Sequence, residues 1–113
     1  MAAPDFSQVT KDTLAARAAM ICNNPSCSCL TVGPSDVNGP LAITVGEAAH
    51  ICAARPGPRY DANMTDEQRA AIENGIWLCA YCHTMVDKNN GADFSTVLLH
   101  RWKNQHEENY QAV

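Results

Sequence analysis

The sequence predicts a small α+β domain built around one core. The chain has 113 residues, which is the length of a single domain. Segments rich in helix formers alternate with short β-branched segments, and 46% of the residues are hydrophobic, so the chain is expected to fold. A chain this short buries a modest core and gains from a staple, and its six cysteines suggest a metal for that role.

The first half of the chain predicts a helix, a loop and a strand. Residues 7–19 are rich in helix formers and predict an N-terminal helix. Residues 22–39 contain several prolines and glycines and predict a loop. Residues 41–45 alternate in character and include β-branched residues, so they predict a strand that leads to His50.

The second half predicts a helix, a strand and another helix. Residues 65–68, with the sequence Thr-Asp-Glu-Gln, form a capping box that starts a helix ending near Asn74. Residues 76–78 are apolar and predict a short strand. Residues 81–88 predict a helix that ends at the following Asn-Asn-Gly break.

A C-terminal helix completes the domain. Asp93 or Ser95 is its expected cap, and its packing face is expected to contain Phe94, Val97, Leu98 and Trp102. We expect its charged residues, Lys103 and His106 among them, to form a solvated face. The single domain, 1–113, then divides into an N-terminal helix (1–21), a zinc-stapled core (22–90) and a C-terminal helix (91–113).

Two pairs of cysteines have the spacing of structural zinc ligands: Cys22 with Cys27, and Cys79 with Cys82. Closing them on one Zn²⁺ would join the N-terminal segment to the second half of the chain. The alternative is that they are buried apolar thiols. Cys29 lies in the same loop as the first pair and could compete, but a gap of one residue is less common for zinc, so Cys22 is preferred.

His83 and Asp87 are spaced four residues apart, which places them on one face of a helix. Together they could hold Mg²⁺, Mn²⁺, Ni²⁺ or Zn²⁺ and leave positions open for phosphate and water. The alternative is an ordinary surface ion pair. Arg55 and Arg59 flank a stiff Pro-Gly-Pro loop after His50 and could contact phosphate, or else remain exposed or pair with Glu47 or Asp61.

The net charge of −4 argues against a domain that binds nucleic acid by bulk electrostatics. Positive charge is needed only where phosphates lie, and the DNA-binding surface could belong in part to a partner domain. The first twenty residues carry charges unlike a secretory signal, and no segment has the length of a membrane span. A cytoplasmic location is expected, and it favours metal-bound thiolates over disulfides.

The order of these motifs resembles the HNH endonucleases, whose ββα-metal motif is often held together by a zinc knuckle. The resemblance covers residues 22 to about 87. It is carried by three motifs: Gly46-Glu47-Ala48-Ala49-His50-Ile51, Asn74-Gly75-Ile76-Trp77-Leu78 and Cys79-Ala80-Tyr81-Cys82-His83-Thr84-Met85-Val86-Asp87. It implies a ββα-metal core with flanking helices and a metal-dependent endonuclease that hydrolyses phosphodiester bonds.

The resemblance implies a role for each site residue. His50 would be the general base that activates water, and His83 with Asp87 would hold a catalytic Mg²⁺, Mn²⁺ or Ni²⁺ that stabilises the scissile phosphate. Asn74 would orient the base or bind metal, and it could also cap a helix beside Gly75.

One position departs from the family. Many members carry a metal-binding Asp or His immediately before the base, where this chain has Ala49. Glu47 is expected to face the wrong side of the strand to replace it. A non-catalytic zinc module that binds nucleic acid or protein is therefore the alternative, whereas a redox role for Cys79 and Cys82 lacks the βαβ setting it needs.

The resemblance also implies partners. The motifs look like those of nuclease modules in bacterial antiphage defence effectors, in which a sensor domain or self-assembly switches the nuclease on. The expected substrate is DNA, with double-stranded DNA preferred over single-stranded DNA or RNA. No membrane association is expected.

Overall fold

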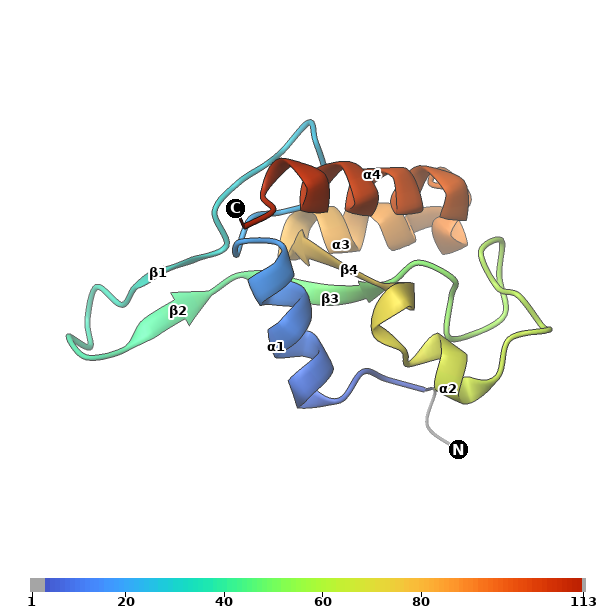
Figure 1. The fold of residues 1–113 in the computed structure, drawn as a ribbon, viewed down its shortest axis with the longest axis horizontal. Helices are drawn as coiled ribbons and strands as arrows, with labels where there is room; N and C mark the ends of the chain where they lie inside the picture. The colour runs from blue at the N-terminus through green and yellow to red at the C-terminus, as the bar shows by residue number, and fades with distance from the viewer. Residues whose placement is uncertain (1–3, 113) are drawn as a thin grey trace.

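The structure, a computed structural model, describes residues 4–112 as a mixture of helices and two small sheets (Figure 1). The α+β class predicted from the sequence is confirmed. In chain order the elements are α1 (Gln8–Arg17), β1 (Val32–Pro34), β2 (Ala42–Thr44), β3 (Gly46–His50), α2 (Asp66–Arg69), η1 (Ile72–Asn74), β4 (Gly75–Cys79), α3 (Ala80–Asp87), η2 (Lys88–Gly91) and α4 (Thr96–Asn109).

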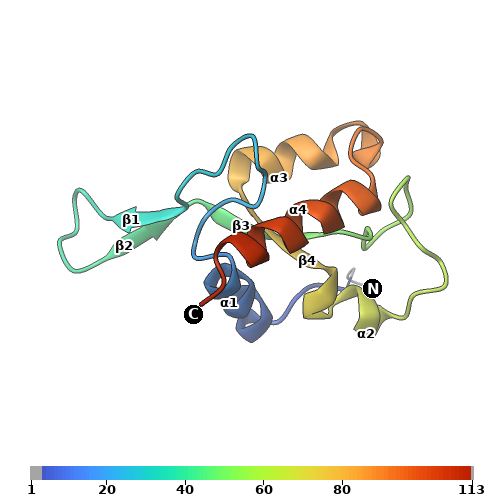
Figure 2. The same ribbon diagram turned by 45° about the horizontal axis from the view of Figure 1, so that its top comes forward.

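The core is built on the antiparallel pair of β3 and β4. Gly46 lies opposite Cys79, and His50 lies opposite Gly75, so the pair is fully in register over five residues. Both views place α1 on one side of this pair and α3 with α4 on the other (Figures 1 and 2). Side chains alternate along a strand, and Trp77 accordingly packs with α1 while Ile76 and Leu78 pack with α3 and α4.

The second sheet is a short hairpin that projects away from the core (Figure 1). β1 pairs with β2, with Val32 opposite Thr44. The strand expected at residues 41–45 is present at Ala42–Thr44, but its partner β1 falls inside the expected loop. Three residues beside prolines and glycines are too few to give a strand pattern. This hairpin leaves Ile43 and Val37 exposed, so these apolar side chains add nothing to the core.

The capping box is confirmed, because Thr65 and Gln68 bond each other's backbone in both directions. The helix it starts is shorter than expected and ends at Arg69 instead of near Asn74. Two carbonyls that a longer helix would use are taken by side chains. The Asn74 amide donates to the Arg69 carbonyl at 3.0 Å, and the Lys103 ammonium donates to the Ile72 carbonyl at 3.1 Å.

The C-terminal helix begins after Ser95, whose hydroxyl caps it. Its buried face was predicted only in part: Phe94 and Trp102 pack against the core, but Val97 is 66% exposed, and the fully buried position is Leu99. Lys103 and His106, expected in solvent, are also buried. The Lys103 ammonium donates to the Gly75 carbonyl at 2.6 Å, and His106 Nε2 bonds the Ala18 carbonyl at 2.9 Å. Buried polar groups that find carbonyl partners carry no apolar sequence signal.

The close fit of Gly46 against Trp77 predicts a stability effect. A methyl group at Gly46 would overlap the indole ring, which is fixed by its hydrogen bond to Thr31 at 3.0 Å. We expect Gly46→Ala to lower the free energy of unfolding by about 1–3 kcal/mol. Gly39→Ala, whose methyl group would meet no atom within 4 Å, is the matched control. Chemical denaturation measures both, and equal stability of the two variants would contradict this packing.

Candidate functional site

Four cysteine side chains from two distant segments converge. Cys22 and Cys27 come from the loop after α1, and Cys79 and Cys82 lie where β4 passes into α3. Their sulfur atoms all lie within 4.8 Å of one another, and those of Cys27 and Cys79 are 4.0 Å apart. Tetrahedral zinc with bonds of about 2.3 Å needs sulfurs about 3.8 Å apart. The four-sulfur cluster predicted from the sequence could therefore hold a metal ion such as zinc.

The electrostatics of the cluster suits a cation. Cys79 caps α3, and its sulfur accepts the Cys82 backbone N–H at 3.4 Å. Burial opposes ionisation, but this bond and those of neighbouring thiols lower the pKa of Cys79 to about 7. Burial raises the pKa of Cys82 to about 11 and also raises that of Cys22. A bound cation would supply the charge that these buried thiols need in order to ionise.

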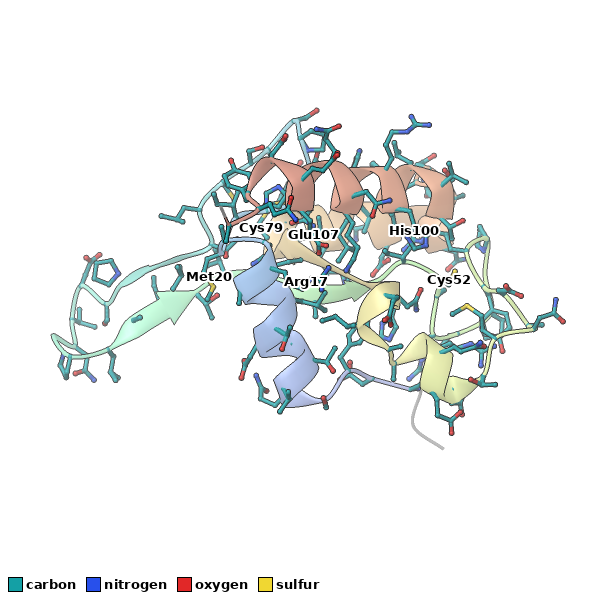
Figure 3. The ribbon with its side chains drawn as sticks, in the orientation of Figure 1. Arg17, Met20, Cys52, Cys79, His100 and Glu107 are labelled. Carbon is teal, nitrogen blue, oxygen red and sulfur yellow. The ribbon has the colours of Figure 1, made fainter. Side chains whose placement is uncertain are left out.

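Two other cysteines lie outside this cluster. Cys29 sits beside it, and burial followed by contacts with the Cys27 and Cys79 thiols raises its pKa to about 12. Cys29 therefore stays protonated where Cys79 ionises readily. Cys52 lies at the opposite end of the β3–β4 pair from Cys79 (Figure 3). The cluster contains Cys22 and not Cys29, as the spacing predicts.

His50, His83 and Asp87 line one cleft of about 250 Å³. β3 delivers His50 at its last residue, and α3 presents His83 and Asp87 one turn apart on the same face. The order strand, strand, helix therefore brings together three residues that the sequence separates. A larger cleft of about 730 Å³ lies between α1 and the end of α4, but its Arg17 and Glu107 pair with each other at 2.6 Å (Figure 3).

His83 contacts two carboxylates. Its Nε2 lies 3.3 Å from Asp87 Oδ2, and its Nδ1 lies 2.8 Å from Glu47 Oε1. The expectation that Glu47 faces the wrong side of the strand is wrong, because it lies opposite Leu78 on the face that packs with α3, and its carboxylate reaches His83. Hydrogen bonding to Asp87, and then to Glu47, raises the pKa of His83 above its usual value despite partial burial.

Arg59 was expected to contact phosphate, but it is buried at 6% exposure and bonded within the protein. Its guanidinium donates to the carbonyls of Ile51 at 3.0 Å and Val86 at 2.9 Å, and further to those of Gly91 and Phe94. Its remaining nitrogen pairs with Asp87 Oδ1 at 2.8 Å. Arg59 therefore ties the loop after His50 to the end of α3 and holds Asp87 by one oxygen.

His50 lies between the N-terminal segment and the cleft. Its ring stacks on Phe6, with centroids 4.2 Å apart and planes 19° from parallel. Its Nε2 is buried and has no hydrogen-bond partner among residues 4–112. Burial is the main cause that lowers the pKa of His50, so its ring is neutral at pH 7. A neutral imidazole with a free nitrogen can accept a proton.

Asn74 orients the chain beside His50 rather than facing the cleft. Its amide oxygen accepts the Cys52 N–H at 2.8 Å, and its amide nitrogen donates to the Cys52 carbonyl at 3.0 Å. The Asn74 carbonyl also accepts the Ile51 N–H at 2.9 Å. These bonds fix the two residues that follow His50. Gly75, not Asn74, is the C-cap of the short helix η1.

Two cations remain at the rim of the cleft. Arg55 is exposed and lines the cleft with His50, and Lys88 is exposed and lines the adjoining hollow with His83. Among residues 4–112 neither forms an ion pair, whereas most other cations are paired or buried, namely Lys11, Arg17, Arg59, Arg69 and Lys103. The positive charge available to an anion at this cleft therefore comes from Arg55 and Lys88.

Sequence reasoning missed two of these residues. Glu47 was dismissed by counting its face from His50, although strand alternation places it on the same face as Ala49. Phe6 carried no sequence signal, because its contact with His50 joins segments 44 residues apart in the chain.

Comparison with protein-family models found no match, and a search of curated proteins found none either. The geometry described above therefore carries the functional argument. Among residues 4–112, no helix has the length and apolar character needed to cross a membrane.

The four-sulfur cluster predicts the effect of losing one ligand. We expect Cys79→Ser to purify with far less than the one zinc ion per chain of the parent protein. Its free energy of unfolding should fall by about 4 kcal/mol or more, the range typical of a lost metal site. Cys52→Ser is the control, because Cys52 lies outside the cluster. Metal analysis and thermal denaturation test this, and full zinc content in Cys79→Ser would contradict the assignment.

Proposed function

We propose that the chain is an HNH-type endonuclease that hydrolyses phosphodiester bonds in DNA with the help of a divalent ion. The observation that carries this proposal is the convergence of His50, His83 and Asp87 on one cleft, beside a cluster of four thiols. The antiparallel strands β3 and β4, followed at once by α3, supply the order of elements that a ββα-metal motif requires. The four thiols hold a structural Zn²⁺ in this proposal.

His50 acts as the general base. Its ring is neutral at pH 7 because burial disfavours the charged form, and its buried Nε2 has no hydrogen-bond partner among residues 4–112 that would compete for the proton of an attacking water. The stack on Phe6 fixes the plane of the ring. Asn74 fixes the chain that follows it, so the base keeps its position relative to α3.

His83 and Asp87 hold the divalent ion. Their facing atoms, Nε2 and Oδ2, are 3.3 Å apart, which suits two neighbouring ligands of one ion at about 2.1 Å from each. Nitrogen and carboxylate donors fit Mg²⁺, Mn²⁺ or Ni²⁺. When bound, such an ion polarises the phosphate and stabilises the departing 3′ oxygen.

Arg55 and Lys88 contact the phosphate groups beside the scissile bond. Both are exposed at the rim of the site and have no carboxylate partner among the described residues. Arg59 is not assigned this role, because its guanidinium already binds carbonyls and Asp87. Two local cations on an acidic chain give weak DNA binding, which supports activation by a sensor domain or by self-assembly.

A non-catalytic zinc module is the second candidate. Ala49 is 1% exposed and packs in the core, so the position before His50 offers no ligand. Both His83 nitrogens also have carboxylate partners, an arrangement that a purely structural histidine would share. One tightly held zinc and no second divalent ion, even with DNA present, would favour this module.

Removal of the base tests the nuclease directly. We expect His50→Ala to reduce metal-dependent nicking of supercoiled plasmid at least about 100-fold, the contribution typical of general base catalysis. Zinc content and the circular dichroism spectrum should remain those of the parent protein, because His50 is not part of the four-sulfur cluster. His100→Ala, on the exposed side of α4, is the matched control. Equal cleavage by His50→Ala and the parent would refute the role of His50.

The pH dependence of cleavage is expected to vary with metal concentration. At saturating metal the rate should rise with pH around a midpoint below pH 6.5, because burial lowers the pKa of His50 below that usual value and the neutral ring is the base. At a low metal concentration the increase in cleavage rate should occur at higher pH. Protons then compete with the ion at His83, whose pKa is raised by Asp87.

Initial rates between pH 5 and pH 9 at two Mn²⁺ concentrations measure this shift. A profile that is identical at both concentrations would contradict the assignment of His83 as a ligand. A profile whose midpoint lies above pH 6.5 at saturating metal would contradict the assignment of His50 as the base.

A further inference from the structure

His83 lies between two carboxylates, and only one of them can share an ion with it. Glu47 Oε1 is 2.8 Å from Nδ1, and Asp87 Oδ2 is 3.3 Å from Nε2. The two nitrogens lie on different edges of the imidazole ring. A single ion on Nε2 therefore has Asp87 as a neighbour, and an ion on Nδ1 would have Glu47.

The cleft selects the Nε2 edge. Asp87 lines the cleft that contains His50 and Arg55, whereas Glu47 lines only the adjoining hollow beside Thr84 and Lys88. An ion that serves the same phosphate as His50 must lie on the Asp87 side. Glu47 then contacts the ring edge that the ion does not use.

We propose that Glu47 is a positioning residue that accepts the Nδ1–H of His83 and so keeps Nε2 unprotonated and aimed at the ion beside Asp87. This inference rests on the proposed function, because it requires the ion site at His83 and Asp87. Metal-bound histidines commonly donate their other ring N–H to a carboxylate, which fixes the tautomer and the ring orientation. Glu47 keeps its half-exposed carboxylate in hydrogen-bond contact with one nitrogen, as that role requires.

Asp87 has a matching arrangement. Its Oδ1 pairs with the buried Arg59 at 2.8 Å, and its Oδ2 faces His83. Each proposed ligand thus has one atom fixed by a neighbour and the other directed at the same point. Outer contacts of this kind offset the missing ligand at Ala49, because two ordered ligands lose less freedom on binding than two mobile ones.

Mn²⁺ binding to the zinc-loaded full chain tests the role of Glu47. Electron paramagnetic resonance of free Mn²⁺ gives the affinity without any cleavage assay, and thiolate-bound zinc is not displaced by Mn²⁺. We expect Glu47→Ala to weaken Mn²⁺ binding about 10- to 100-fold, the cost typical of a lost outer contact. Glu47→Gln, whose amide oxygen still accepts the Nδ1–H, should recover most of that loss. Glu108→Ala, an exposed carboxylate on α4, is the control for net charge.

The tautomer of His83 gives the second readout. In the zinc-loaded chain without the second ion, at a pH where the ring is neutral, nitrogen-15 NMR should show the proton on Nδ1, and Glu47→Ala should shift it toward Nε2, where Asp87 is the remaining partner. Unchanged Mn²⁺ affinity in Glu47→Ala, or a ring protonated on Nε2 in the parent, would overturn the inference.

Mn²⁺ binding by the parent and by His83→Ala distinguishes an error in the role of Glu47 from an error in the ion site itself. If the parent binds Mn²⁺ and His83→Ala does not, the ion site stands whatever Glu47 does. If the parent binds no Mn²⁺, or if His83→Ala binds it equally well, the ion site itself is wrong and the role of Glu47 is refuted with it.

Discussion

The convergence of four cysteine sulfurs is the constraint on which the rest of the structure depends. It joins the loop after α1 to the junction of β4 and α3, two segments more than fifty residues apart in the sequence. Burial raises the pKa of Cys22 and Cys82, so their thiolates are costly without a cation, and metal binding at this cluster would be coupled to folding. The start of α3 is thereby fixed, and His83 follows Cys82 directly on that helix. The four-sulfur cluster thus fixes the position of His83, the first residue of the proposed ion site.

Buried cations hold the other end of the same framework. The Arg59 guanidinium binds carbonyls from the loop after His50 and from the end of α3, while Lys103 binds the carbonyls on either side of Asn74. Each charge is neutralised by dipoles or a carboxylate and tolerates burial for that reason. A small chain with few large apolar residues uses such contacts to position its loops. Both ends of α3 beside the cleft are therefore fixed, the start by the four-sulfur cluster and the end by Arg59.

Local patterns predicted much of this arrangement from sequence alone. The capping box at residues 65–68, the apolar strand before Cys79 and the spacing of the cysteine pairs each depend on neighbouring residues and are confirmed. The predictions that were wrong depended on contacts between distant segments. Arg59 looks like a surface arginine until its carbonyl partners are known, and Lys103 and His106 look solvated for the same reason. Glu47 was misjudged because its face was counted from His50, three residues on, whereas alternation places it on the face of Ala49 and of its partner Leu78, which packs with α3.

The proposed nuclease uses two ions with separate roles, a structural one on the thiols and a catalytic one beside His83. Plasmid cleavage by protein stripped of all metal, then supplied with Zn²⁺, with Mg²⁺ or with both, tests this division most directly. We expect one equivalent of Zn²⁺ to restore the fold without cleavage, Mg²⁺ alone to restore neither, and both ions together to restore cleavage. Full cleavage by the stripped protein with Mg²⁺ alone, or with one equivalent of Zn²⁺ alone, would contradict this division.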